Sequence, residues 1–310
     1  MKYAIVSLAV VLAALVGIIA ASCGVGQGAE SAGPVPTGDP GGDVSPATTQ
    51  SDSETVPPPT SGSTSTSPSK TMTYQVWFTR GESLYAVNRT ENASPGVGTA
   101  ALEALLEAPA PTEQAAGIGS QVPVGTKLLA LSVDKGIATV DLTSEFESGG
   151  GSASMNMRIA QIVYTLTQFP TVQGVLFELD GRPVDVLGGE GVIVDHPVTR
   201  KDYRSLLPAI LVKSPGIGEH VPNPVTVVGS ANVFEANVTV EVVDANGNVV
   251  GSEFTTATCG TGCRGTFSVT VPYEVSSAQR GLIIVHDDDA AGTGTPPNEV
   301  RIPVVLTSSS

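Results

Sequence analysis

The chain has 310 residues and carries 15 basic against 30 acidic side chains, which gives a formal net charge of −15. A surface this acidic excludes binding to nucleic acid and adhesion by charge to anionic lipids or anionic polymers. Any association of the folded chain must therefore come from a specific pocket, a bridging cation or a protein partner. The length allows two domains of ordinary size.

The N-terminal end has the features of an export signal. A basic residue near the start precedes an apolar run from Ala4 to Ala21, and small residues then lead to Cys23. This pattern favours lipoprotein processing, with residues 1–22 removed as a signal peptide. Two acyl chains on Cys23 anchor a protein stably, so we expect the chain on the outer face of the cytoplasmic membrane. A retained transmembrane segment is the alternative, because the apolar run approaches the length that spans a bilayer.

The segment after the signal has the composition of a linker. Residues 24–70 contain no Leu, Ile, Phe, Tyr or Trp and are dominated by Gly, Ser, Thr, Pro and Ala. Such a segment cannot bury enough apolar surface to fold, so we predict a disordered, lipid-anchored linker over residues 23–70. As a flexible coil it would reach about 35–40 Å.

The other two cysteines are close together in the sequence. Cys259 and Cys263 lie four residues apart in a predicted hairpin, and export places them in an oxidising compartment, where disulfides form. We therefore predict a disulfide between them. A zinc site would need further ligands, and the three histidines are each isolated in the sequence. No metal or other cofactor is expected.

Strand and helix patterns alternate from residue 71 to about 190. Helices are predicted through Leu102 and Leu106 and from Ile159 to Phe169, where apolar residues recur at helical spacing. Strands are predicted at 75–80, 83–88, 127–133, 136–142, 174–180 and 183–187. The order ββα-ββα-ββ predicts an α+β domain with helices on one face of a largely antiparallel sheet.

Residues 191–208 have the composition of a connector, and no helical period remains beyond Pro208. Asn246-Gly247 is a strong signal for a hairpin turn. Short strands separated by Gly, Pro, Asn and Ser are predicted at 209–212, 225–230, 238–243, 249–254, 265–271, 281–286 and 300–306. This spacing predicts an all-β immunoglobulin-like sandwich over residues 209–307.

Five sequence blocks of the first domain carry a family resemblance. They are 100–109 (AALEALLEAP), 122–129 (VPVGTKLL), 138–146 (ATVDLTSEF), 160–169 (AQIVYTLTQF) and 177–181 (FELDG). In this order they resemble the GerMN domain of bacterial sporulation and germination proteins.

The second domain carries a resemblance of its own. Blocks 210–215 (ILVKSP), 227–231 (VVGSA) and 234–238 (FEANV) resemble the immunoglobulin-like domain of bacterial spore germination proteins. Together the two resemblances imply a cell-envelope protein acting in sporulation, spore germination or cell-wall maintenance. They imply no activity, since they bring no catalytic residues with them.

Two acidic residues in the first domain suggest an alternative function, that of an enzyme. Asp141 and Glu145 straddle the end of a predicted strand, which would place two carboxylates at one edge of the sheet. Paired carboxylates perform acid–base chemistry or hold a cation, and here they would make the chain a peptidoglycan-active hydrolase. The alternative is that Thr143 or Ser144 caps a turn and both acids are solvated.

Three uncharged residues are candidates for ligand contacts. Gln161 and Thr165 fall on the helix face opposite the apolar one, which is usually solvated; beside a groove they would supply its polar groups. Trp77, the only tryptophan, lies on the first predicted strand. There it would pack in the core or, if exposed, stack on a sugar ring.

Asp287, Asp288 and Asp289 follow a predicted strand of the sandwich. They could hold calcium in a calcium-dependent adhesion module, but calcium takes roughly six to eight oxygens, so a solvated loop is the alternative.

We predict a non-catalytic envelope lipoprotein that binds or scaffolds. Its expected partners are the membrane, through the lipid on Cys23, and a cell-wall component or envelope protein, and not nucleic acid.

Overall fold

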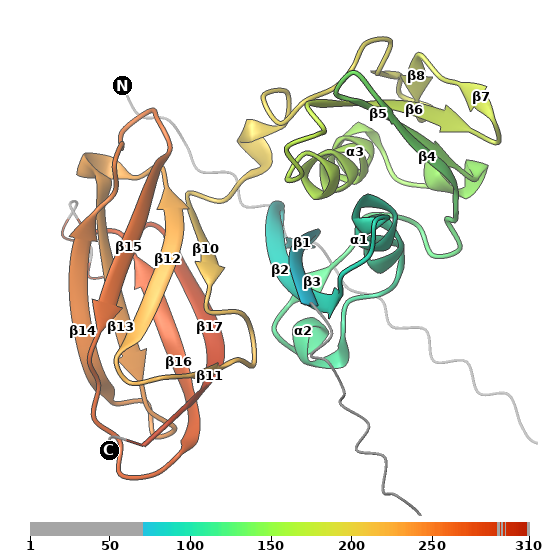
Figure 1. Ribbon diagram of the computed structural model, residues 1–310. Helices are drawn as coiled ribbons and strands as arrows, with labels where there is room; N and C mark the ends of the chain where they lie inside the picture. Colours follow the sequence, from blue (N-terminus) through green and yellow to red (C-terminus); the bar gives the residue numbers. More distant parts are fainter. Residues whose placement is uncertain (1–70, 290–291, 293, 295, 309–310) are drawn as a thin grey trace, which may run out of the picture. The chain divides into compact units, whose positions relative to one another are not determined.

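The computed structural model describes residues 71–289, 292, 294 and 296–308 (Figure 1). The predicted signal peptide, the lipidation site Cys23 and the predicted linker lie outside the described residues. No helix in the described ranges is long and apolar enough to cross a membrane.

The first domain contains two small sheets with helices between them. One sheet has the strand order β2-β1-β3 and the other the order β4-β5-β6-β7. The strands are β1 (Thr71–Arg80), β2 (Ser83–Asn92), β3 (Ile118–Gly119), β4 (Leu128–Asp134), β5 (Ile137–Leu142), β6 (Gly174–Leu179) and β7 (Arg182–Pro183), followed by a separate hairpin of β8 (Val186–Leu187) and β9 (Val192–Ile193). The helices are α1 (Val97–Leu106), α2 (Pro111–Ala115), α3 (Ser152–Leu166) and the 3-10 turn Ser144–Glu147.

The predicted α+β architecture is confirmed, with two differences in the sheet. First, β5 and β6 are parallel, with Ile137 opposite Gly174 and Leu142 opposite Leu179. The chain crosses from β5 to β6 through α3, and a crossover of this kind brings two strands side by side in the same direction. Second, the β1–β2 hairpin forms its own sheet instead of extending the other one.

From Met157 on, helix α3 is buried on every side, because it packs against α1, against β1 of one sheet and against β6 of the other (Figure 1). Every residue from Arg158 to Leu166 is buried. The predicted helix is therefore present, but the prediction that one of its faces is solvated is wrong. Polar side chains on that face have to find partners inside the protein.

The segment that follows β9 contributes to the core of the first domain. Val194, Val198 and Tyr203 are buried in the same cluster as the apolar residues of α3. Val198 also forms an isolated bridge to Val175 of β6. The 3-10 turn Arg204–Leu206 follows. Part of the segment predicted as a connector is thus packed as part of the first domain.

Arg200 fastens this segment to α3. Its guanidinium donates to Thr167 Oγ1 at 2.7 Å and to the carbonyl oxygen of Tyr164 at 2.8 Å. The same group lies 4.7 Å from the ring centroid of Tyr164 and 5.6 Å from that of Trp77. Burial lowers the pKa of Arg200, but a guanidinium stays charged in proteins, so both rings face a cation.

The second domain is all-β, as predicted. One sheet has the strand order β10-β12-β15 and the other the order β11-β17-β16-β13-β14. The strands are β10 (Ile210–Ser214), β11 (His220–Val221), β12 (Val225–Ala231), β13 (Asn237–Val243), β14 (Val249–Thr256), β15 (Gly265–Val271), β16 (Gln279–His286) and β17 (Glu299–Leu306). Each predicted strand is present, and β11 is an addition that pairs in parallel with β17.

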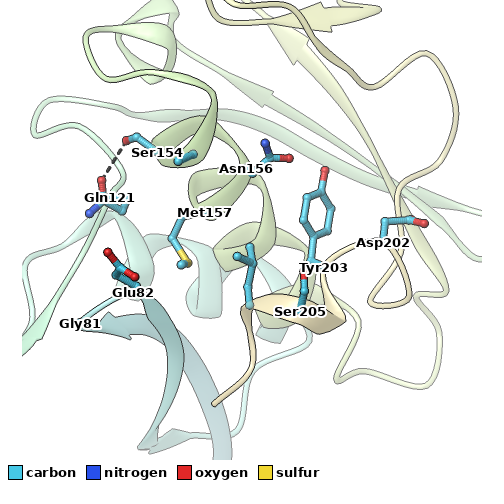
Figure 2. A pocket seen from close by; sticks show the side chains of 11 residues that line it. Gly81, Glu82, Gln121, Ser154, Asn156, Met157, Asp202, Tyr203 and Ser205 are labelled. Atoms are coloured by element: carbon cyan, nitrogen blue, oxygen red, sulfur yellow. Dashed lines mark hydrogen bonds between the residues drawn. The ribbon is translucent and has the colours of Figure 1, made fainter. Parts of the chain in front are cut away.

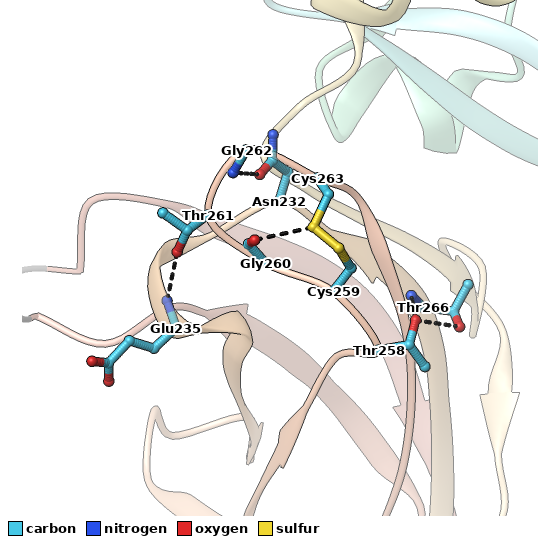
Figure 3. Close-up of a disulfide and its surroundings, with 9 residues drawn as sticks. All are labelled: Asn232, Glu235, Thr258, Cys259, Gly260, Thr261, Gly262, Cys263 and Thr266. Atoms are coloured by element: carbon cyan, nitrogen blue, oxygen red, sulfur yellow. Dashed lines mark hydrogen bonds between the residues drawn. A yellow bond between two sulfur atoms is a disulfide. The ribbon is translucent and has the colours of Figure 1, made fainter.

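A disulfide joins Cys259 and Cys263 in the loop between β14 and β15, with their Cα atoms 5.7 Å apart (Figure 3). The loop is fastened to the turn that precedes β13. Gly262 N donates to Asn232 Oδ1 at 3.0 Å, and Thr261 N donates to the carbonyl oxygen of Val233 at 2.9 Å. The two loops therefore form one connected end of the sandwich.

Candidate functional site

The two polar candidates on α3 are structural. Gln161 and Thr165 are 0% exposed. Gln161 Nε2 donates to the carbonyl oxygen of Trp77 at 3.1 Å, and the Trp77 backbone N donates to Thr165 Oγ1 at 3.1 Å. The two side chains thus satisfy both backbone groups of one β1 residue, and neither lies on an open surface.

Trp77 is likewise part of the core. Its side chain is 1% exposed, and its ring centroid lies 4.8 Å from that of Tyr164 at an interplanar angle of 53°. An aromatic ring enclosed in this way has no free face for a sugar. Of the two alternatives for Trp77, packing in the core is the one that the structure shows, because α3 covers β1 at this position.

Asp141 and Glu145 lie in different environments. Asp141 is buried, and its Oδ1 accepts a hydrogen bond from Gly181 N at 3.0 Å, which fixes the turn after β6. Glu145 is exposed, and a hydrogen bond from the Thr143 side chain lowers its pKa. A general acid needs a raised pKa to keep its proton near neutral pH, so the environment of Glu145 works against that role.

The three aspartates after β16 bond to separate protein groups. Asp287 is buried and accepts from the backbone N and Nδ2 of Asn298 at 2.9 and 2.6 Å. Asp288 accepts from Asn237 Nδ2 at 3.0 Å, and Asp289 accepts from Gly294 N. Within the described part of the chain, no group of three or more His, Cys, Asp and Glu side chains is placed to hold a metal ion.

A cleft of about 560 Å³ opens at the N-terminal end of α3 (Figure 2). No residue of the predicted site lines it. Its walls are the β1–β2 turn, a loop after β3, the first turns of α3 and the segment after β9. The lining residues are Gly81, Glu82, Gln121, Ala153, Ser154, Asn156, Met157, Asp202, Tyr203, Ser205 and Leu206.

Local structure holds the walls in place. Gly81 has a positive φ of 58°, which allows the tight turn between the paired residues Arg80 and Ser83. Ser154 Oγ donates to Gln121 Oε1 at 2.9 Å, as Figure 2 shows. The backbone N of Gln121 donates to Gln161 Oε1 at 2.9 Å. The loop is therefore tied to α3 at two points.

Tyr203 reaches the cleft from the core. Its side chain is 6% exposed, and its hydroxyl has no hydrogen-bond partner among the described residues. Burial, with a smaller contribution from the charge of Asp202, raises the pKa of Tyr203 to about 12. The hydroxyl therefore stays protonated at neutral pH and can donate a hydrogen bond into the cleft.

The fixed charges at the cleft are negative. Glu82 and Asp202 are exposed and lie on opposite walls (Figure 2). Asp202 Oδ2 accepts from the backbone N and Oγ1 of Thr199 at 2.7 and 3.0 Å, so its orientation is fixed. Among the described residues, no Lys, Arg or His side chain lines the cleft. The site can therefore bind by hydrogen bonding and by attraction of positive charge.

Two family models match the chain in succession. Residues 61–185 match the family described as Germane, sporulation and spore germination. Residues 209–293 match Gmad2, the immunoglobulin-like domain of bacterial spore germination. No protein among the curated ones matches.

Solved structures show distant likenesses. The tandem GerMN domains of the sporulation protein GerM from Bacillus subtilis are 15% identical with a TM-score of 0.39, over 78% of this chain and 62% of that one. The first GerMN domain of the same protein is 21% identical with a TM-score of 0.36, over 42% of this chain and 99% of that one. A Clostridium perfringens protein described as a candidate lipoprotein is 20% identical with a TM-score of 0.32, over 44% of this chain and 93% of that one.

Proposed function

The chain carries a Germane domain followed by a Gmad2 immunoglobulin-like domain, and from this pair we propose a lipid-anchored binding protein of the cell envelope. It acts in sporulation, spore germination or cell-wall maintenance, and it contributes binding or scaffolding rather than catalysis. Both domain families are linked to sporulation and germination, and neither is known as catalytic. The ligand site is the cleft at the start of α3.

The cleft is the observation that carries this proposal. Its volume of about 560 Å³ lies within the usual range of small-molecule sites. Gln161, Thr165 and Asp141 have their hydrogen bonds satisfied within the fold. Tyr203, in contrast, brings a polar group to the cleft that the described protein does not satisfy. A ligand group would meet that unsatisfied hydroxyl.

Blocking the cleft tests the proposal. Ala153 is exposed in the first turn of α3 and lines the cleft, so Ala153→Trp fills the space without disturbing the core. When the full chain in detergent is sedimented with purified wall sacculi, we expect the parent protein to pellet. The variant should pellet only as much as it does without sacculi.

Ala115→Trp is the matched control, because Ala115 is exposed on α2 and does not line the cleft. It should pellet like the parent. Pelleting of Ala153→Trp at the parent level would show that the cleft is not the wall-binding site. Reducing ends released into the supernatant should stay at background; release that disappears on substitution of Asp141 and Glu145 would establish the hydrolase instead.

The lipid anchor has a separate test. Cys23→Ala removes the thioether on which the acyl chains would be carried, so we expect the variant to move from the detergent phase to the aqueous phase on phase partition. Ser22→Ala, one residue earlier, keeps the cysteine and should partition like the parent. A Cys23→Ala protein that stays in the detergent phase would indicate a retained apolar segment as the anchor.

A further inference from the structure

We propose that the cleft at the start of α3 accepts an amino sugar with a free ammonium group, a polyhydroxylated ring that carries positive charge. The inference rests on the proposed function, in which this cleft binds the ligand, and narrows the ligand to one chemical class. Three features of the cleft support it: its charge, its unsatisfied hydrogen-bonding groups and its apolar floor.

The charge of the cleft selects against anions. Glu82 and Asp202 lie on opposite walls with no basic side chain in the described lining, and the whole chain has a net charge of −15. A phosphate or a carboxylate would be repelled, whereas an ammonium group between the walls is attracted to both. Glu82 makes no hydrogen bond or ion pair within the described residues, so its carboxylate is available to a ligand.

The helix N-terminus does not reverse this preference. The first turn of a helix usually favours anions, because its backbone N–H groups lack partners. In α3, however, Glu190 Oε2 already accepts from Ser152 N at 2.6 Å. That hydrogen bond also lowers the pKa of Glu190. The positive end of α3 is therefore occupied by a carboxylate of the protein itself.

The unsatisfied polar groups call for a ligand that both donates and accepts. The hydroxyl of Tyr203 and the Nε2 of Gln121 are donors without a partner in the described structure, while Glu82 accepts only. Gln121 and Glu82 are exposed and the Tyr203 ring is buried, so these groups are open to a ligand that enters the cleft. Each hydroxyl of a sugar can donate and accept at once, so the hydroxyls of the ring can accept from Tyr203 and Gln121, while the ammonium group donates to Glu82.

The floor of the cleft provides an apolar surface for the ring. Met157 is buried with one edge lining the cleft (Figure 2), and Leu206 contributes from the opposite wall. A sugar ring has C–H faces that pack on such a surface while its hydroxyls point sideways. A simple amine would leave this floor uncovered, and that difference separates an amino sugar from a small cation.

Calorimetric titration of the full chain in detergent tests the class of ligand. The probes are glucosamine, N-acetylglucosamine, glucose and ethanolamine, at a pH where the amines are protonated. We expect glucosamine to bind about ten-fold more tightly than N-acetylglucosamine or glucose, because a hydrogen bond to a charged group contributes more than a neutral one. Ethanolamine should bind more weakly than glucosamine because it lacks the ring.

Two variants locate the contacts. Glu82→Gln should weaken glucosamine binding by about ten-fold and leave glucose unchanged. Glu103→Gln, which alters an exposed residue on α1 away from the cleft, makes the same change in net charge and should leave both affinities unchanged. Tyr203→Phe keeps the buried ring and removes only the hydroxyl, so it should weaken glucosamine and glucose alike.

The outcomes separate this inference from the proposed function. Equal affinity for glucosamine and glucose, or for glucosamine and ethanolamine, would overturn the assignment of an amino sugar. Absence of heat with all four probes also overturns it; if Ala153→Trp still abolishes pelleting with sacculi, the cleft binds a wall component of another class and the proposed function stands. If none of the probes gives heat and Ala153→Trp pellets like the parent, both the amino-sugar assignment and the proposed function of the cleft fail.

Discussion

Replacing Gln161 with leucine is expected to lower the free energy of unfolding by about 3 kcal/mol. Gln161 Nε2 donates to the carbonyl oxygen of Trp77 and to Ser120 Oγ, both at 3.1 Å, and its Oε1 accepts from Gln121 N at 2.9 Å. Leucine has a similar volume but no polar atoms. It would leave the Trp77 carbonyl buried without that partner, which costs more than the net gain of an average hydrogen bond.

Urea denaturation followed by tryptophan fluorescence measures this effect. Trp77 is the only tryptophan, and its carbonyl oxygen accepts a hydrogen bond from the side chain that is substituted. Its emission therefore reports on unfolding of the first domain. Gln173→Leu, at an exposed position before β6, is the matched control and should change the stability little. A loss of less than about 1 kcal/mol for Gln161→Leu would mean that the interior adapts to an unsatisfied carbonyl, contrary to expectation.

Gly265→Ala is expected to destabilise the sandwich by at least about 3 kcal/mol. Gly265 begins β15 and is buried. A Cβ atom at this position would overlap the backbone N and O of Cys259, where the disulfide loop folds back over the strand. Thr258 N also donates to the carbonyl oxygen of Thr266 at 2.9 Å. Backbone held this closely on both sides of the glycine cannot move aside without breaking hydrogen bonds.

Thermal unfolding of the sandwich, followed by amide exchange in β12 and β15, measures the change. Gly216→Ala is the control, because a Cβ there meets only Glu219 Oε2 at an ordinary 3.6 Å. It should leave the protection of these strands unaltered. Reducing the disulfide should shrink the difference between Gly265→Ala and the parent, since a released loop can shift. If the amides of β12 and β15 in the oxidised Gly265→Ala protein exchange as slowly as in the parent, the close approach of the Cys259 backbone to Gly265 is contradicted.

The sandwich was the more predictable domain because its signal is local. In β12 the buried Val225 and Val227 alternate with exposed neighbours, and the same alternation marks β15. Each strand can be recognised from its own residues and the turns that flank it. This recognition does not require the order in which the strands pair in the sheets, so the strands could be predicted without knowing their neighbours.

The first domain was less predictable because the same residue pattern can belong to a buried or a solvated element, and the elements packed against it decide which. The spacing of Gln161 and Thr165 on α3 is that of a solvated face, and only the β1–β2 sheet lying over it turns that face inward. The parallel pairing of β5 with β6 depends on the crossover through α3. The periodicity of either strand contains no information about that partner.

The cleft could not be predicted for a similar reason. Its lining comes from four stretches of the chain, at 81–82, 121, 153–157 and 202–206, and no short motif spans them. Tyr203 lies in a charged stretch, between Asp202 and Arg204, which is typical of an exposed turn. Its burial follows from contacts with the core of the first domain, and these contacts exist only in the folded protein.

One wall of the cleft belongs to the segment at 202–206, which Arg200 and Tyr203 fasten to the first domain. A ligand that touches both walls binds the docked segment and not a detached one. Docking and binding therefore strengthen each other by the same factor. Three residues further on, the Gmad2 domain begins. A ligand in the cleft would therefore also hold in place the stretch of chain that leads into the second domain.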